Sequence, residues 1–134
     1  MTEPIYAVEP NLTAVEFQQL LRDSTLAERR PADDLPRLDR MLRGANLILT
    51  ARIDGVLVGI ARSVTDFAYC CYLSDLAVSK TAQGQGIGRE LIERTRKHCG
   101  PEVSVILLAA PGAVTFYESI PMPRHPNAFM FRGE

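Results

Sequence analysis

A glycine-rich segment is the part of the sequence best suited to carry chemistry. Residues 83–88 read Gln-Gly-Gln-Gly-Ile-Gly, after a β-rich run that ends near Val78 and directly before a helical pattern that starts at Gly88. A tight turn at the start of a helix exposes several main-chain N–H groups, and the helix dipole adds partial positive charge there. Glycine lets an anion reach these amides because it has no side chain. The segment therefore predicts a pyrophosphate-binding site.

Three other interpretations of this segment can be compared with it. A nucleotide-binding P-loop ends in Gly-Lys-Ser/Thr, whereas Gly88 is followed by Arg89 and Glu90. A dinucleotide-binding turn has the spacing G-x-G-x-x-G near the start of a βαβ unit, whereas these glycines alternate and lie past the middle of the chain. A glycine-rich connection that only joins a strand to a helix is the structural alternative, and spacing alone leaves it open.

The first half of the chain predicts two helices and a hairpin. We expect a strand over 5–8, then a helix over 12–21 in which Asn11 or Thr13 is the cap. The prolines and charges of 24–36 predict a loop, and the apolar spacing that follows predicts a helix over 35–43 that ends at Gly44. Two β-rich runs, 46–53 and 56–63, flank Asp54-Gly55, which is a strong signal for a tight hairpin.

The second half predicts a crossover between parallel strands. We expect these elements in order: a strand over 69–78, a helix over 88–98, a strand over 103–109 buried on both faces, a short helix over 112–119 and a strand over 127–132. Hairpin-linked strands followed by a strand–helix–strand unit predict an α/β (α+β) fold. Its mixed sheet would be mostly antiparallel, with one parallel pair and helices on both faces. Without a repeat or linker, residues 1–134 are expected to form a single domain.

Composition narrows the range of partners. The net charge of −1 argues against nucleic-acid binding, which needs a clustered cationic face. No apolar stretch approaches the roughly 20 residues of a membrane span. The three cysteines include an adjacent pair and form no CxxC motif, which argues against a disulfide framework or a zinc site and favours reduced thiols. We expect a cytoplasmic protein without a metal, and a homodimer formed by free strand edges is one option.

At this point the residues resemble a known family. Residues 83–88 fit the Q/R-x-x-G-x-G/A signature of the GNAT acetyltransferase superfamily, and Asp75-Leu-Ala-Val resembles that family's fourth strand. The run 103–109 and the following Phe116-Tyr117-Glu118 are similar to its fifth strand and next helix. The order of elements from Ile5 to Phe131 agrees as well, so the resemblance covers essentially the whole chain. It implies an acetyl-CoA-dependent N-acetyltransferase.

The resemblance also implies how acetyl-CoA would be held. Main-chain amides of the glycine segment would bind its pyrophosphate, and the fourth strand would run beside its pantetheine arm in a gap next to the fifth strand. The implied cofactor-binding residues are Leu76, Ala77, Val78, Gln83, Gly84, Gln85, Gly86, Ile87, Gly88 and Arg89.

For catalysis, the resemblance places Tyr117 where the family often has a general acid that protonates the departing thiolate. Asp75 is the candidate for the base or for the anion that binds the amine, because it would lie at the acceptor end of the fourth strand. The main-chain N–H of Leu76 could polarise the thioester carbonyl. Each side chain also has a structural alternative, since Tyr117 could pack in the core and Asp75 could be a surface or loop-pairing carboxylate.

The acceptor is the least determined part. The acceptor is expected to be a small-molecule amine or a protein amino group, with Tyr72, Asp23 and His125 as candidate contacts. Residues 120–126 contain three prolines where the family often has a Gly-Phe pair, so this region departs from the pattern. The arginines between Arg22 and Arg43 alternate with acidic residues, and we interpret them as solvated helix faces, with an acceptor-binding role as the alternative. A CoA-binding module without transferase activity is the alternative function.

Overall fold

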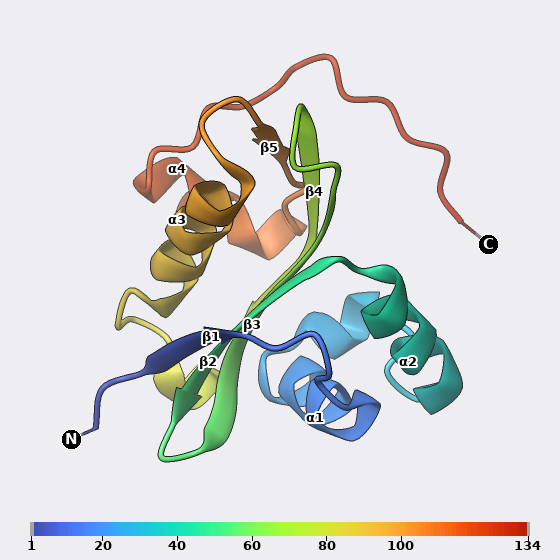
Figure 1. Cartoon of the computed structure of the whole chain (residues 1–134), viewed down its shortest axis with the longest axis vertical. Helices are drawn as coiled ribbons and strands as arrows, with labels where there is room; N and C mark the ends of the chain where they lie inside the picture. Colours follow the sequence, from blue (N-terminus) through green and yellow to red (C-terminus); the bar gives the residue numbers. More distant parts are fainter. Residues whose placement is uncertain (1, 134) are drawn as a thin grey trace.

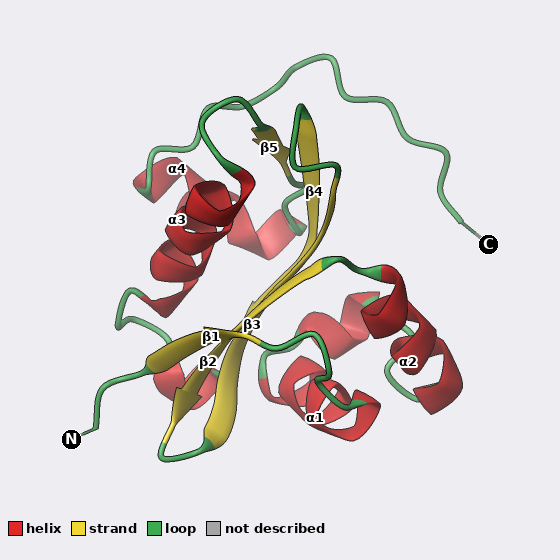
Figure 2. Ribbon diagram, in the orientation of Figure 1, coloured by secondary structure: helices red, strands yellow, loops and turns green. Residues whose placement is uncertain are grey.

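The structure, a computed structural model, describes residues 2–133 and consists of a twisted sheet flanked by helices (Figures 1 and 2). The strands are β1 (Ile5–Val8), β2 (Leu47–Ile53), β3 (Val56–Thr65), β4 (Cys70–Val78) and β5 (Ser104–Ile106). The α-helices are α1 (Ala14–Asp23), α2 (Leu35–Gly44), α3 (Ile87–Cys99) and α4 (Val114–Ser119). Short 3-10 turns are η1 (Leu26–Arg29), η2 (Lys80–Ala82) and η3 (Pro111–Ala113).

The strands follow one another across the sheet in chain order, from β1 to β5. Neighbouring strands are antiparallel except β4 and β5, which are parallel. The predicted mixed fold with one parallel pair is therefore confirmed. The hairpin between β2 and β3 forms as expected, because Asp54 and Gly55 both adopt the positive φ that a type I′ turn needs, 51° and 79°.

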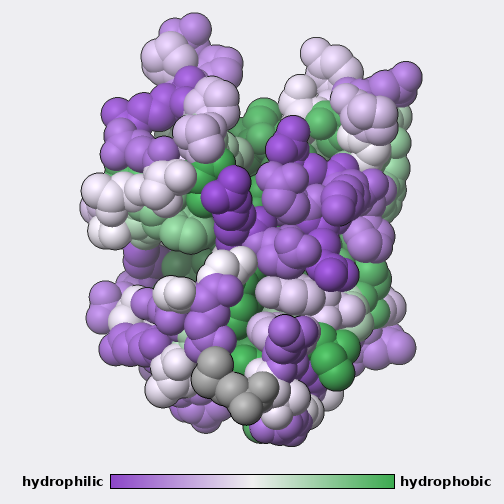
Figure 3. Space-filling model, turned by 90° about the vertical axis from the view of Figure 1, so that its left-hand side faces the viewer, coloured by the Kyte–Doolittle hydropathy of each residue, from purple (hydrophilic) through white to green (hydrophobic). Residues whose placement is uncertain are grey.

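Helices cover both faces of the sheet (Figure 1). On one face α1 and α2 pack through an apolar cluster around Phe17, Leu38 and Ile60, while on the other α3 packs through a cluster around Leu91 and Leu49. The Thr13 side chain caps α1 by accepting a hydrogen bond from the Glu16 N–H at 3.2 Å, so of the two expected caps Thr13 is the one used. Where α3, α4 and the N-terminal segment face the viewer, Figure 3 shows mainly polar side chains with small apolar patches between them.

A β-bulge in β4 changes which residues face which layer. Arg62 of β3 pairs with Asp75, but the next residue, Ser63, pairs with Leu73, so Ser74 has no partner of its own. Leu73 packs on the α3 side, whereas Asp75, two positions later, lies on the α1–α2 side. Without the bulge the strict alternation of a strand would place both on one face. The bulge therefore moves Asp75 to the opposite layer and turns Leu76 toward the α3 side.

Two expectations about the C-terminal part are wrong. The strand predicted over 103–109 spans only Ser104–Ile106, and its residues are half-buried or exposed rather than buried on both faces. The strand predicted over 127–132 does not form, and the Phe129 and Phe131 side chains are fully exposed, at 95% and 105%. The short β5 and the missing strand over 127–132 have the same physical reason. The prolines of 120–126 lack N–H donors, and among residues 2–133 no strand lies outside β5 to cover that edge.

Candidate active site

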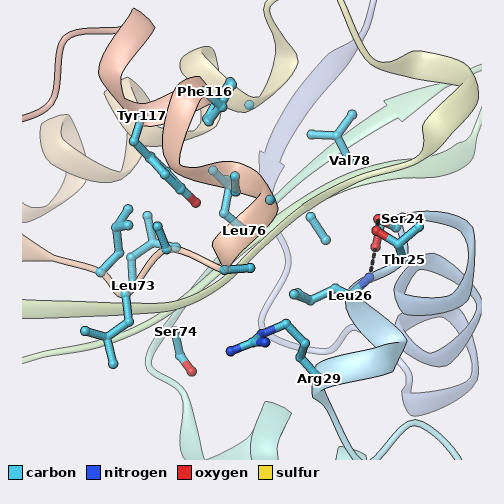
Figure 4. Close-up of a pocket in the computed structure, with 18 of the residues that line it drawn as sticks. Ser24, Thr25, Leu26, Arg29, Leu73, Ser74, Leu76, Val78, Phe116 and Tyr117 are labelled. Carbon is cyan, nitrogen blue, oxygen red and sulfur yellow. Dashed lines mark hydrogen bonds between the residues drawn. The ribbon is translucent and has the colours of Figure 1, made fainter. Parts of the chain in front are cut away.

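The candidate site is a cavity of about 1140 Å³ that opens where β4 and β5 separate. The two strands pair only from Cys70–Ser104 to Tyr72–Ile106, so the edge of β4 from Leu73 onward has no strand partner among the described residues. Four parts of the chain form the walls: β4, the turn before α3, the segment Leu107–Ala113 with α4, and the segment around η1. Figure 4 shows Leu76 and Val78 from β4 and Tyr117 from α4 around this space.

At one end the glycine turn presents main-chain donors to the cavity. Gly84 and Gly86 both adopt φ +81°, a conformation that L-residues with side chains rarely adopt, and a Cβ at either position would contact nothing. Gly86 is the N-cap residue directly before α3, and no side chain caps this helix end. The first-turn N–H groups therefore point to open space, which is the arrangement that binds phosphate oxygens.

Gly88, the third glycine of the alternating set, has a different structural role. A Cβ on Gly88 would lie 2.9 Å from Phe116 Cζ, so a larger residue here would require the Phe116 ring of α4 to shift. Gln83 fixes the other side of the turn by donating from Nε2 to the Val78 carbonyl at 3.0 Å. Of the predicted cofactor residues, Gln85 and Arg89 are exposed and do not line the cavity, and the other eight line it.

Tyr117 lines the middle of the cavity from α4. In Figure 4 its ring lies beside Leu76, with the hydroxyl directed into the space next to β4. The ring stacks edge-to-face on Phe116, with centroids 5.1 Å apart. Burial raises the pKa of the Tyr117 hydroxyl, and the nearby positive charge of Arg30 opposes this rise. The hydroxyl therefore keeps its proton at neutral pH, as an acid requires.

Asp75 lies outside the cavity, contrary to the position expected for a base. Its side chain is fully buried and is held by two ion pairs, one to Nε of Arg30 and one to Nε of Arg62. Arg62 also donates to Ser74 Oγ at 3.0 Å and to the Met41 carbonyl at 3.1 Å. The carboxylate thus has a guanidinium partner on each oxygen, and the bulge at Ser74 directs it toward α2. The structure gives Asp75 the surroundings of a structural ion pair.

The candidate acceptor residues are not brought together. Tyr72 does line the cavity. Asp23 accepts a hydrogen bond from Gln19 Nε2 at 2.9 Å and lies in a separate hollow beside Lys80. His125 is exposed, and its Nδ1 accepts from the Asn127 N–H at 3.2 Å.

The segment around η1 forms the opposite wall of the cavity. The sequence favours solvated helix faces for its arginines, with an acceptor-binding role only as the alternative. Ser24, Thr25, Leu26, Glu28, Arg29 and Arg30 line the cavity. One signal could have indicated it: 24–36 is a long stretch between helices, and long irregular connections are often functional. Glu28 is the only carboxylate among the described residues that line the cavity.

Comparison with known proteins decides the family. The family model "Acetyltransferase (GNAT) domain" matches residues 30–121, more than half of the chain. This chain belongs to the GNAT acetyltransferase family.

Relatives and solved structures agree with this GNAT assignment. An uncharacterized N-acetyltransferase of Prochlorococcus marinus is 31% identical over 86% of the chain, and the match spans 65% of that relative's length. A Staphylococcus aureus protein of unknown function has a TM-score of 0.79 at 20% identity, covering 98% of each chain. An aminoglycoside N-acetyltransferase in complex with CoA has a TM-score of 0.73 at 15% identity, covering 99% of this chain and 96% of that one. The two structures show the same fold.

Two further observations concern the GNAT domain as described. No group of three or more His, Cys, Asp or Glu side chains within residues 2–133 is arranged to hold a metal ion. In the same part of the chain, no helix has both the length and the apolar character needed to cross a membrane. The homodimer and the cytoplasmic location stay predictions.

Proposed function

We propose that the domain binds acetyl-CoA in the cavity between β4 and β5 and transfers the acetyl group to a primary amine. The single observation that carries this proposal is the continuity of one cavity. It joins the unpaired edge of β4, the glycine turn at the start of α3 and the Tyr117 hydroxyl. Acetyl-CoA would supply an activated thioester, with its pyrophosphate at the Gly84–Gly86 turn and its pantetheine arm along Leu76–Val78. The CoA-bound structural neighbour supports this choice of donor.

Glu28 is the proposed base in place of Asp75. An alkyl amine, with a pKa of about 10, is mostly protonated at neutral pH and must lose a proton before it can attack. Glu28 is the carboxylate that faces the cavity from η1, whereas Asp75 has both oxygens occupied by arginines. One ammonium proton would pass to Glu28 directly or through a water molecule, and the neutral nitrogen would then attack the thioester carbonyl carbon. The attack leaves a positive charge on the nitrogen, which would lose its second proton to solvent as the intermediate collapses to the amide.

Tyr117 is the proposed acid. As the carbon–sulfur bond breaks, the thiolate sulfur takes the hydroxyl proton of Tyr117, which solvent then replaces. The burial that raises the Tyr117 pKa keeps this proton in place until the thiolate forms. The main-chain N–H of Leu76 would stabilise the negative charge that develops on the carbonyl oxygen.

A transfer assay tests the proposal. Purified protein is incubated with acetyl-CoA and a panel of amino acids, polyamines, aminoglycosides and lysine peptides, and free thiol release is measured. Amine-dependent release is expected for at least one class, together with an increase in melting temperature on adding CoA. An increase with CoA but no release for any amine would contradict the transferase and favour the CoA-binding module.

A further inference from the structure

We propose that the acceptor amine carries a carboxylate on the same molecule, as an amino acid does, and that Arg29 binds this carboxylate. The inference rests on the proposed function, because it concerns the acceptor end of the same cavity. It goes beyond the expectation that Asp75 binds the amine, because it concerns a second charged group of the acceptor. The argument starts from the charges that surround this end of the cavity.

The acceptor end has an excess of positive charge. Arg29, Arg30 and Arg132 line the cavity, and Glu28 is the single acidic side chain among the described lining residues. Beneath this wall, one buried carboxylate, that of Asp75, is shared by two guanidinium groups. The buried cluster therefore keeps one net positive charge, which favours an anion in the space above it.

The two adjacent arginines have different roles. The Arg30 guanidinium is fully engaged: Nε pairs with Asp75, one terminal nitrogen donates to the Ser74 carbonyl at 2.8 Å, and the other to the Arg29 carbonyl at 2.8 Å. Among the described residues the Arg29 guanidinium has no ion pair or hydrogen-bond partner of its own. Figure 4 shows this side chain leaving η1 toward Ser74 on β4. Arg29 therefore presents a guanidinium whose donors are available, and its planar fork matches a carboxylate.

The segment that carries Arg29 is fixed in place. Thr25 precedes η1 with φ 73°, a strained conformation for a β-branched residue. Behind it, Gln18 donates to the Ala32 carbonyl at 2.7 Å, and Arg22 pairs with Asp33 at 2.8 Å. Strain that the surrounding contacts maintain is typical of a functional segment. The anchoring of this segment would position Glu28 and Arg29 together, so that the amine and the carboxylate of one acceptor meet neighbouring side chains.

The decisive experiment compares an acid with its amide in two proteins. The ratio of kcat/KM for L-alanine to that for L-alaninamide is measured in the wild type and in Arg29→Gln. Dividing the wild-type preference by the preference of Arg29→Gln cancels the different basicities of the two amines, because both proteins receive the same two compounds. We expect the preference for the carboxylate to fall at least about tenfold in Arg29→Gln, the scale of a charge-assisted pair. The exposed Arg40→Gln on α2 removes the same charge away from the cavity and should leave the preference unchanged.

A binding measurement separates this inference from the proposed function. N-acetyl-L-alanine, in the presence of CoA, should raise the melting temperature of the wild type more than that of Arg29→Gln, while N-acetyl-L-alaninamide should not distinguish the proteins. This result together with no turnover would support the carboxylate site and overturn the transferase. Turnover with an equal or higher preference for the amide, or a preference that Arg29→Gln leaves unchanged, would overturn the carboxylate site alone.

Discussion

The two ends of the cavity are built in different ways. The phosphate end, where we propose that the pyrophosphate binds, consists of main-chain groups from one contiguous segment, the turn over 83–88 and the start of α3. The acceptor end, where we propose that the amine binds, consists of side chains from η1 and β4, which are more than forty residues apart, as the Arg30–Asp75 pair shows. Main-chain groups fixed by local geometry are insensitive to most substitutions, whereas a side-chain wall changes with each residue. Under the proposed function, one end would therefore keep a common donor while the other would set the acceptor.

The largest effects are expected at the acceptor end, where one variant should change stability and another should change turnover. Asp75→Asn leaves Arg62 and Arg30 without their carboxylate, and we expect the free energy of unfolding to fall by about 3–5 kcal/mol. Thermal unfolding should then occur roughly 10 °C lower or more. Glu28→Gln should leave the melting temperature unchanged and reduce kcat about 100-fold. The reverse pattern, a stable Asp75→Asn protein that has lost turnover, would restore Asp75 as the base.

The next effect tests the phosphate end. Gly86→Val forces a branched residue into φ +81° and places its side chain over the first amides of α3. We expect the CoA dissociation constant, measured by titration calorimetry, to rise at least about 30-fold, since two charge-assisted hydrogen bonds are lost. Gly100→Val is the matched control, because Gly100 also has positive φ, +96°, but ends α3 away from the cavity. Equal CoA affinity in both variants would remove the pyrophosphate from this turn.

A smaller effect is expected where the two ends meet. Tyr117→Phe should lower kcat about tenfold and leave CoA affinity unchanged, because only the proton donor is lost. Burial raises the Tyr117 pKa above its ordinary value of 10, so the protonated acid persists on the alkaline side. The kcat of the wild type should therefore show no loss from this group below about pH 10. An alkaline decrease centred well below pH 10 that disappears in Tyr117→Phe would contradict the raised pKa.

The smallest effect is expected at Gln83. Among the described residues, its side chain is the only one that links the glycine turn to β4 by a hydrogen bond. Gln83→Ala removes the donor to the Val78 carbonyl, an exposed contact. The loss is expected to cost about 0.5–1 kcal/mol and to weaken CoA binding two- to fivefold, while kcat stays the same. A loss as large as that of Gly86→Val would show that side chains, and not main-chain geometry, hold the phosphate end.

The sequence by itself determined the features that depend on neighbouring residues. The helix after the glycine turn, the Asp54-Gly55 hairpin and the order of strands and helices as far as α4 all follow from local spacing, and the structure shows them. The glycine turn before α3 could be predicted for the same reason, since its residues are neighbours in the sequence and its glycines mark the turn.

Only the tertiary structure decided the acceptor end. One unpaired residue, Ser74, reverses the side of the sheet that Asp75 occupies, and nothing in the run of residues marks that bulge. The pairing of Arg30 with Asp75, and with it the position of Arg29, depends on how α1 and α2 pack against the sheet. The tail also fails to form its expected strand, because a strand needs a partner as well as a suitable sequence. Contacts between distant segments determine side-chain direction, and here that direction decides which acidic residue faces the cavity.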